Sequence, residues 1–275
     1  RMKKKSYAIV GNPITHSLSP FLHNYWFDKY KIEANYVLLG TKEEDLEGAV
    51  NKIRNKELSG INVTLPYKQK IIKFIDKLVN DAQLTNSVNT VFLDDSNVLV
   101  GENTDVFGMQ AAYLKEIANA EDKKALVIGA GGVSPSIILS LQKSKIKNIS
   151  IINRTIDKSI LLKKRFSFLS ILEWEFLKDK IQNYDIIINA TSLGLKNGQN
   201  FNFNFENVKD NLIYIDTIYN PLETKTLKFL KEKKVKTFNG LDMFIYQGQK
   251  SFYLWNKVNP QIDVELINLL VSKLR

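Results

Sequence analysis

The chain has 275 residues, 44% of them hydrophobic, which is enough to bury a sizeable core in one large domain or, more naturally, in two smaller ones. It has no cysteine and only two histidines, which excludes disulfides and cysteine-ligated zinc, and we expect no metal site. The formal net charge of +10 favours anionic ligands, but the lysines are dispersed, which disfavours a nucleic-acid partner. No apolar run is long enough to span a membrane and the first residues do not resemble a signal peptide, so we expect a cytoplasmic protein.

Short apolar runs alternate with longer amphipathic stretches in the first part of the chain. Strands are predicted there at residues 7–10 and 35–39, and helices at residues 20–30 and 43–55. Residues 88–93 and 98–100 flank a polar turn and predict a hairpin, after which a helix is expected over 105–118. This alternation is typical of an α/β fold in which mostly parallel strands have helices on both faces.

A second series of strands and helices begins after the predicted hairpin. Its strand candidates are residues 125–129, 149–153, 185–189, 212–216 and 236–238, and two helices are expected at 241–258 and 264–274. Terminal helices with apolar stripes must bury them, so we expect these two to dock on the first unit. The predicted organisation is a domain of residues 1–104 plus 240–275, an inserted domain of residues 105–239, and a ligand cleft between them.

The first strand of the second series runs into a glycine-rich turn and then an apolar helix. Gly129 permits a tight turn, Gly131 and Gly132 let the backbone approach a pyrophosphate, and the helix N-terminus offers unpaired N–H groups. Such turns also end strands in proteins that bind no nucleotide, but the strand-turn-helix context favours a nucleotide site. Ser136 stands where a Rossmann fingerprint usually has Gly or Ala.

The segment about twenty residues after the glycines carries the signal for the type of cofactor. An NAD enzyme places an Asp or Glu there, whereas this chain has Asn153, Arg154 and Thr155, followed by Lys158. A carboxylate would repel a 2′-phosphate, and a guanidinium with a second cation nearby would bind one. The segment therefore favours an NADP site over the alternative that Arg154 and Lys158 are ordinary solvated basic residues.

Polar side chains also follow two predicted strands of the first unit. Ser17 and Ser19 stand near a helix start, where they are either capping residues or a clamp for a carboxylate. Asn62 and Thr64 share one face of a strand by its two-residue period. Lys68 is expected at the next helix start, which is unusual because the helix dipole is positive there, and this makes it a candidate functional residue.

Motifs along nearly the whole chain resemble those of the shikimate dehydrogenase family and stand in that family's order. They are GNPITHSLSP, GINVTLPYK, VNTV, ENTDVFG, GAGG, NRT, NATSLG, DTIYNP and GLDMFIYQG. The resemblance implies an NADP-dependent oxidoreductase that reversibly reduces 3-dehydroshikimate to shikimate in the biosynthesis of aromatic amino acids. It also implies two α/β domains, a substrate-binding domain completed by the C-terminal helices and an inserted Rossmann domain that binds NADP.

The same resemblance assigns roles to individual residues. Lys68 and Asp105 become the catalytic acid/base pair, in which Lys68 donates a proton to the developing alkoxide and Asp105 orients the same hydroxyl. The residues implied for the substrate are Ser17 and Ser19 at the carboxylate, Asn62, Thr64, Asn89, Asp105 and Gln247 at the ring hydroxyls, and Tyr219 beside the ring and the nicotinamide. The residues implied for the cofactor are Gly129, Ala130, Gly131, Gly132, Val133, Asn153, Arg154, Thr155, Lys158, Thr191, Ser192, Gly194, Gly240 and Met243.

Other functions stay open at this stage. The nearest is a quinate/shikimate dehydrogenase with broader substrate use and often NAD preference; the NRT segment argues against NAD, while quinate turnover is not excluded. A binding protein on the same fold would have lost the chemistry, which the presence of both Lys68 and Asp105 disfavours. Lys158 stands where relatives often have arginine, so NADP preference is expected to be weaker than usual. We expect small-molecule ligands, no nucleic acid and no membrane, and consider a homodimer as the assembly.

Overall fold

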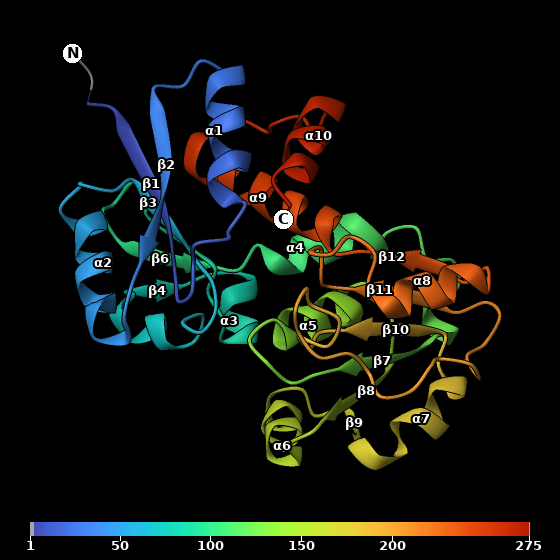
Figure 1. Cartoon of the computed structure of the whole chain (residues 1–275). Coiled ribbons are helices and arrows are strands. Elements are labelled where there is room, and N and C mark those ends of the chain that lie inside the picture. The colour runs from blue at the N-terminus through green and yellow to red at the C-terminus, as the bar shows by residue number, and fades with distance from the viewer. Residues whose placement is uncertain (1–2, 275) are drawn as a thin grey trace. The chain divides into compact units, whose positions relative to one another are not determined.

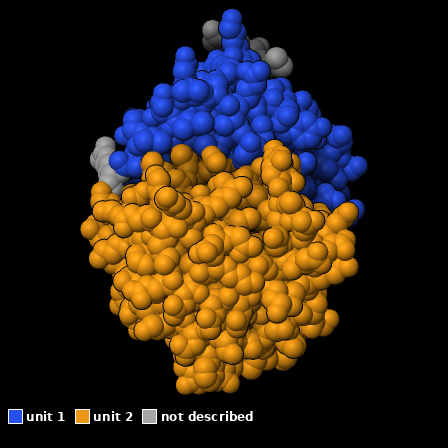
Figure 2. Space-filling view, turned by 90° about the vertical axis from the view of Figure 1, so that its right-hand side faces the viewer, with its two compact units in different colours: residues 1–105, 245–274 blue, residues 106–244, 275 orange. Residues whose placement is uncertain are grey.

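The structure is a computed structural model that describes residues 3–274 and divides into two compact units. The first unit comprises the chain up to Asp105 together with Ile245–Leu274, and the second comprises Val106–Phe244 (Figure 2). The second change of unit lies inside helix α9 (Leu241–Asn256), whereas the boundary predicted from the sequence is at residue 240. Helix α9 from Ile245 onward and helix α10 (Val264–Ser272) thus belong to the first unit.

Within the described residues, the sheet of the first unit has six strands in the order β2-β1-β3-β5-β6-β4. Their bounds are β1 Lys5–Gly11, β2 Ala34–Gly40, β3 Gly60–Val63, β4 Lys77–Leu78, β5 Thr90–Leu93 and β6 Leu99–Glu102. Strand β1 pairs in parallel with β2 and β3, and β5 pairs antiparallel with β3 and β6. The predicted hairpin is confirmed, and it makes this sheet mixed because two strands joined by a tight turn run antiparallel. The short strand β4 has no counterpart in the prediction.

The two faces of this sheet are covered by different helices, and the alternation of side chains along β1 shows how (Figure 1). Ala8 and Val10 belong to the apolar cluster that includes the buried side of helix α2 (Leu46–Arg54). Tyr7 points to the other face, where its ring stacks on Phe27 of helix α1 (Ser19–Lys29). Because successive strand residues point to opposite faces, a strand buried on both sides reads as a continuous apolar run.

The C-terminal helices are attached to α1 by hydrogen bonds as well as by apolar contacts. Trp26 Nε1 donates to the backbone oxygen of Gln261 at 2.9 Å, and the Tyr25 hydroxyl donates to the carboxylate of Asp263 at 2.7 Å. Asp263 also accepts from the N–H of Leu266 at 2.9 Å and so caps α10. These contacts fix the end of the chain on the first unit.

The second unit is a doubly wound sheet whose strands all run parallel. Within its described residues the strand order is β12-β11-β10-β7-β8-β9. The bounds are β7 Lys124–Ile128, β8 Asn148–Asn153, β9 Ser170–Glu173, β10 Ile186–Asn189, β11 Ile213–Asp216 and β12 Lys236–Phe238. The order reverses between β7 and β10, the point at which such sheets bind ligands at the carboxyl ends of their strands. Edge strand β9 was missed by the pattern because its side chains are only half-buried or exposed.

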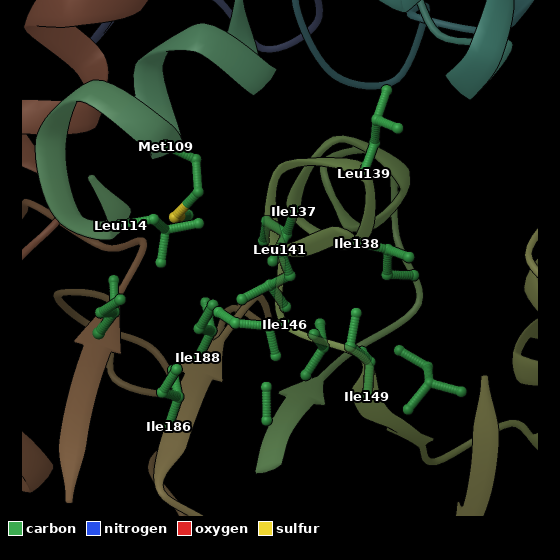
Figure 3. Close-up of a cluster of buried hydrophobic side chains, with 14 of the residues drawn as sticks. Met109, Leu114, Ile137, Ile138, Leu139, Leu141, Ile146, Ile149, Ile186 and Ile188 are labelled. Atoms are coloured by element: carbon green, nitrogen blue, oxygen red, sulfur yellow. The ribbon is translucent and has the colours of Figure 1, made fainter. Parts of the chain in front are cut away.

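The core of this second unit explains why its central strands are almost wholly apolar. In Figure 3, Ile186 and Ile188 of β10 face Ile137 and Leu141 of helix α5 within one buried cluster. The helices of this unit begin with α4 Asp105–Met109, whose first residue belongs to the first unit, and which is continued by a π-helical turn Gln110–Leu114. They continue with α5 Ser134–Lys143, α6 Ile156–Arg165, α7 Leu177–Lys180 and α8 Lys225–Glu232. The helix expected to reach residue 118 thus ends at Leu114. Residues 3–274 contain no helix with the length and apolar character of a membrane span.

Candidate active site

The first unit contains a close pair of opposite charges. Lys68 Nζ donates to Asp105 Oδ2 at 2.7 Å, and the two side chains are only 12% and 8% exposed. Asp105 begins α4, where a negative charge is favoured by the helix dipole, and its N–H donates to Asn103 Oδ1 at 2.9 Å. Lys68 does not begin a helix as the sequence suggested; it lies in a turn before a 3₁₀ helix, Lys70–Phe74. The dipole argument for Lys68 is therefore wrong, because no helix begins at this residue. What distinguishes Lys68 in the structure is its contact with Asp105.

Asn89 links this pair to two further segments. Its Nδ2 donates to Thr104 Oγ1 at 2.8 Å, to Asp105 Oδ1 at 3.3 Å and to Gln247 Oε1 at 3.4 Å. Its Oδ1 accepts from the N–H of Thr104 at 2.8 Å. Both oxygens of Asp105 are thus engaged, one by an ammonium and one by an amide, which holds the carboxylate in one orientation. The structure thus brings the side chains of Asn89, Asp105, Lys68 and Gln247 together.

Asn62 is the centre of a second part of the same polar cluster. Its side chain is 4% exposed, and its Oδ1 accepts from the Tyr36 hydroxyl at 2.8 Å. Its Nδ2 lies 3.2 Å from both Thr90 Oγ1 and Ser251 Oγ. Sequence reasoning missed Tyr36, Thr90 and Ser251, although Ser251 stands one helical turn after Gln247 on α9, and this spacing was a usable signal.

The two serines near the start of α1 lie next to each other. The N–H of Ser19 donates to Ser17 Oγ at 3.2 Å, and α1 has no side-chain cap, so Ser17 satisfies a backbone group of the first helical residue. Ser19 is buried beside Tyr36. Burial raises the pKa of Tyr36 well above its usual range, and the neighbouring Ser19 side chain offsets part of that rise. The Tyr36 hydroxyl itself donates to Asn62 Oδ1.

Thr64 follows the end of β3 and packs over the end of β1. A Cβ placed on Gly11 would overlap Thr64 Cγ2, so only glycine leaves room for this side chain. The N–H of Thr64 donates to the backbone oxygen of Val10 at 2.9 Å. Asn62 lies in β3, whereas Thr64 is the first residue after the end of that strand, so the shared strand face stays a prediction.

In the second unit, the glycine-rich turn after β7 has the form that the sequence predicts. Gly129 has φ +108°, and a Cβ there would lie 2.9 Å from Thr191 Cγ2, in the turn after β10. A Cβ on Gly131 would meet no atom within 4 Å, so the turn leaves open space at this position. Helix α5 then begins at Ser134 without a side-chain cap, and Ser136 is fully buried in the place where close packing requires a small residue.

The residues at the end of β8 divide into those that hold the turn and those that are exposed. Asn153 Oδ1 accepts from the N–H of Ala130 at 3.0 Å, and its Nδ2 donates to the backbone oxygen of Thr155 at 2.9 Å. Arg154, Thr155 and Lys158 are exposed, and Thr155 precedes α6 without capping it. Asn153 therefore supports the glycine turn, and the two exposed cations, Arg154 and Lys158, lie at the start of α6.

The turn after β10 is held by a buried carboxylate. Asn189 Oδ1 accepts from Thr191 Oγ1 at 2.7 Å and from its N–H at 3.0 Å, and Asn189 Nδ2 lies 3.3 Å from Asp216 Oδ1. Asp216 is fully buried and also accepts from the N–H of Ile218 at 3.0 Å and from Thr224 Oγ1 at 3.2 Å. Burial raises the pKa of Asp216 to about 6, against the lowering effect of these hydrogen bonds. Sequence reasoning missed Asp216, which joins the turn of Thr191 to the turn after β11.

Three further predicted residues lie around the start of α9 in the second unit. The ring of Tyr219 lies 5.2 Å from that of Phe244, and burial raises the pKa of Tyr219 to about 12. A Cβ on Gly240 would overlap the backbone oxygen of Thr217, so this close approach requires glycine. Met243 is buried in the main core cluster. Ser192 is exposed and Gly194 buried in the turn after β10.

These residues fit a dinucleotide with a 2′-phosphate. The open space at Gly131 and the uncapped start of α5 suit a pyrophosphate, because backbone N–H groups at a helix N-terminus bind anions. Arg154 and Lys158 supply positive charge at the end of the neighbouring strand β8.

Comparisons with known proteins match this chain over most of its length. A model described as "Shikimate dehydrogenase substrate binding domain" matches residues 9–91, and one described as "Shikimate / quinate 5-dehydrogenase" matches residues 112–221. The shikimate dehydrogenase (NADP(+)) of Pelagibacter ubique is 45% identical over 267 residues, which cover 97% of this chain and 99% of the relative.

Solved structures show the same relationship. The shikimate dehydrogenase of Aquifex aeolicus matches with a TM-score of 0.88 and 32% identity, covering 100% of this chain and 99% of that one. The enzyme of Thermus thermophilus, in complex with NADP(H) and shikimate, matches with a TM-score of 0.85 and 29% identity over 98% of each chain. With matches to both family models and 45% identity to a full-length relative, this chain belongs to the shikimate dehydrogenase family.

Proposed function

We propose that the chain catalyses the reversible NADP-dependent reduction of 3-dehydroshikimate to shikimate, with Lys68 and Asp105 as the acid/base pair. The observation that carries the assignment of the pair is the 2.7 Å contact between Lys68 Nζ and Asp105 Oδ2 in a largely buried position. An ion pair on the surface contributes little to stability and does not have to be buried. An acid/base group, in contrast, must be held at one place beside the oxygen that it serves.

The proton balance of the reaction suits this pair. When bound, NADPH supplies the hydride that reduces the ketone carbon. The Lys68 ammonium donates a proton to the oxygen that becomes the hydroxyl, and in the reverse direction the neutral amine accepts it. The Asp105 carboxylate holds Nζ in position and balances its charge, while Asn89 holds the other carboxylate oxygen at 3.3 Å. One proton and one hydride are thus added to the ketone.

The polar residues around the pair suit a small hydroxylated acid. We assign Ser17 and Ser19 to its carboxylate, because both residues stand at the start of α1, where the N–H of Ser19 donates to Ser17 Oγ. We assign the ring hydroxyls to Asn62, Thr64, Asn89, Asp105 and Gln247, and we keep Tyr219 beside the ring. A site built of amides and hydroxyls discriminates by hydrogen bonding, since a ligand that lacks a hydroxyl leaves a buried polar group unpaired.

The residues that hold the cofactor in this proposal belong to the second unit. Gly129 to Val133 and the N-terminus of α5 bind the pyrophosphate, and Arg154, Thr155 and Lys158 bind the 2′-phosphate. Asn153 holds the glycine turn in shape. The nicotinamide end is assigned to Thr191, Ser192, Gly194, Tyr219, Gly240 and Met243.

Initial rates of nicotinamide reduction test the proposal. We would measure shikimate and quinate, each with NADP and with NAD, for the unmodified chain, for Lys68→Ala and for the control Lys70→Ala. Lys70 is exposed and pairs with Glu43, so its loss removes a charge only two residues away without touching the proposed site. We expect turnover of shikimate with NADP that Lys68→Ala abolishes and Lys70→Ala retains.

The other outcomes separate the alternatives. Comparable rates with quinate or with NAD would show a quinate/shikimate dehydrogenase, and no turnover with any pair would show a binding protein on this fold. The cytoplasmic location, the homodimer and the lack of a nucleic-acid partner stay predictions. Light scattering after size-exclusion chromatography checks the homodimer.

A further inference from the structure

Arg154 and Trp174 are the first residues after two neighbouring strands, β8 and β9, which end side by side. Strands β8 and β9 are parallel and pair Asn153 with Glu173, so the next residue of each chain segment emerges beside the other. The Arg154 guanidinium carbon lies 5.4 Å from the centre of the Trp174 ring. This is the separation of a cation–π contact, in which the guanidinium is attracted to the face of the indole.

The Trp174 ring is itself held in place. It is partly buried against the apolar cluster that includes Ile152 of β8 and Leu177 of α7. It also begins a short 3₁₀ helix, Trp174–Phe176, so its backbone is not part of a long loop. A ring anchored in this way presents a fixed surface to the arginine beside it.

Contact with a ring leaves the arginine available to a ligand. Among residues 3–274, no carboxylate lies within ion-pair distance of the Arg154 guanidinium. A carboxylate partner would occupy the donor fork and cancel the charge, whereas an aromatic face orients the guanidinium and uses none of its five N–H donors. Arg154 is therefore oriented but still unpaired.

We propose that Trp174 is the positioning residue that orients Arg154 toward the 2′-phosphate of NADP, and that it thereby strengthens the preference for NADP over NAD. The inference rests on the proposed function, which places the 2′-phosphate at Arg154. The Lys158 ammonium acts on the same phosphate as a point charge, and its position need not be exact. Hydrogen bonds in fixed directions come from the planar guanidinium of Arg154, so its orientation matters. Loss of the ring would free the guanidinium to move, and the entropy of ordering it would then oppose binding.

Equilibrium binding of 2′,5′-ADP and of 5′-AMP, followed by isothermal titration calorimetry, tests the inference without turnover. The variants are Trp174→Leu, Trp174→Phe and the control Phe176→Leu, which removes an exposed aromatic residue from the same 3₁₀ helix. We expect Trp174→Leu to weaken 2′,5′-ADP by about two- to fivefold, the range of a partly exposed cation–π contact, and to leave 5′-AMP unchanged. Trp174→Phe should restore much of the loss, and Phe176→Leu should change neither ligand.

A double-mutant cycle separates this inference from the function on which it rests. In the background of Arg154→Ala, Trp174→Leu should have no further effect on 2′,5′-ADP, because its influence acts through the arginine. If Arg154→Ala leaves 2′,5′-ADP binding intact, the proposed 2′-phosphate site is wrong. If Arg154→Ala weakens 2′,5′-ADP but Trp174→Leu does not, or if Trp174→Leu weakens both ligands equally, the site stands and the role of Trp174 is overturned.

Discussion

Lys68 Nζ and Asp105 Oδ2 lie 2.7 Å apart although 37 residues separate them in the chain. The turn after β3 supplies the lysine and the first residue of α4 supplies the aspartate. Asn89, next to β5, bonds to the second carboxylate oxygen. The pair is thus assembled by three segments of one sheet edge, and each partner has a defined orientation.

Replacement of the carboxylate by an amide tests this orientation. Asp105→Asn keeps the shape of the side chain but removes the charge that holds Lys68, so we expect kcat to fall by about 100- to 1000-fold with shikimate and NADP. In the double variant with Lys68→Ala, kcat should fall by a factor much smaller than the product of the two single factors, because the two residues act as a unit. Asp95→Asn, in an exposed turn, should leave kcat unchanged.

Ser251 joins the two parts of the polar cluster in the first unit. Its Oγ lies 2.8 Å from Thr90 Oγ1 and 3.1 Å from Thr104 Oγ1. Ser251→Ala leaves buried hydroxyls with fewer partners, so we expect the free energy of unfolding in urea to fall by about 1–3 kcal/mol. We also expect a higher KM for shikimate with a smaller change in kcat. Ser272→Ala, near the C-terminus and exposed, is the matched control.

Two glycines of the nucleotide turn should respond differently to the same substitution. Gly131→Ala adds a methyl group where no atom lies within 4 Å, so the melting temperature should not change, while NADP affinity falls by about tenfold or more as the methyl occupies the phosphate cradle. Gly129→Ala meets Thr191 at 2.9 Å and has φ +108°, so it should lower the melting temperature as well. Equal melting temperatures for the two variants would contradict this account.

His23 gives the first unit a sensitivity to acid. Its ring stacks on Tyr36 at 4.6 Å, and neither ring nitrogen has a hydrogen-bond partner among the described residues. Burial lowers the pKa of His23 from 6.5 to about 3, so the unfolded chain binds more protons between these values and stability is lost as the pH falls through this window. His23→Phe removes the effect, and its stability relative to wild type should rise by up to about 1.4 kcal/mol per pH unit on acidification, measured by urea unfolding.

Asp216 should act in the opposite direction in the second unit. Burial raises its pKa from 3.8 to about 6, so the folded chain binds more protons between these values. The stability that this carboxyl contributes is present below pH 3.8 and is lost as the pH rises through 6. The amide of Asp216→Asn does not ionise and can still accept from Ile218 and Asn189. The unfolding free energy of the variant minus that of wild type should therefore rise by about 1–3 kcal/mol from acid to neutral pH. A constant difference across this range would refute the assignment.

Much of the fold followed from local pattern. The βα alternation, the hairpin of β5 and β6 and the glycine turn before α5 were each visible as short runs with a fixed period. The pattern failed at β4 and β9, which are short strands at the sheet edges, because half-exposed residues have no strong apolar period. It also overextended the helix that begins at Asp105, which ends after a π-helical turn at Leu114.

The sequence by itself determined the fold class, the nucleotide turn and the identity of most candidate residues, because turns, strand periods and motifs depend on residues that are close together in the chain. Only the tertiary structure decided the contacts: that Lys68 lies in a turn against Asp105, that Ser251 and Tyr36 complete the polar cluster, and that the Arg154 guanidinium lies over the Trp174 ring. These pairs are far apart in the chain or lie on different strands, and no local preference specifies them. They form because strand pairing and the burial of two cores bring the ends of separate segments to the same sheet edge.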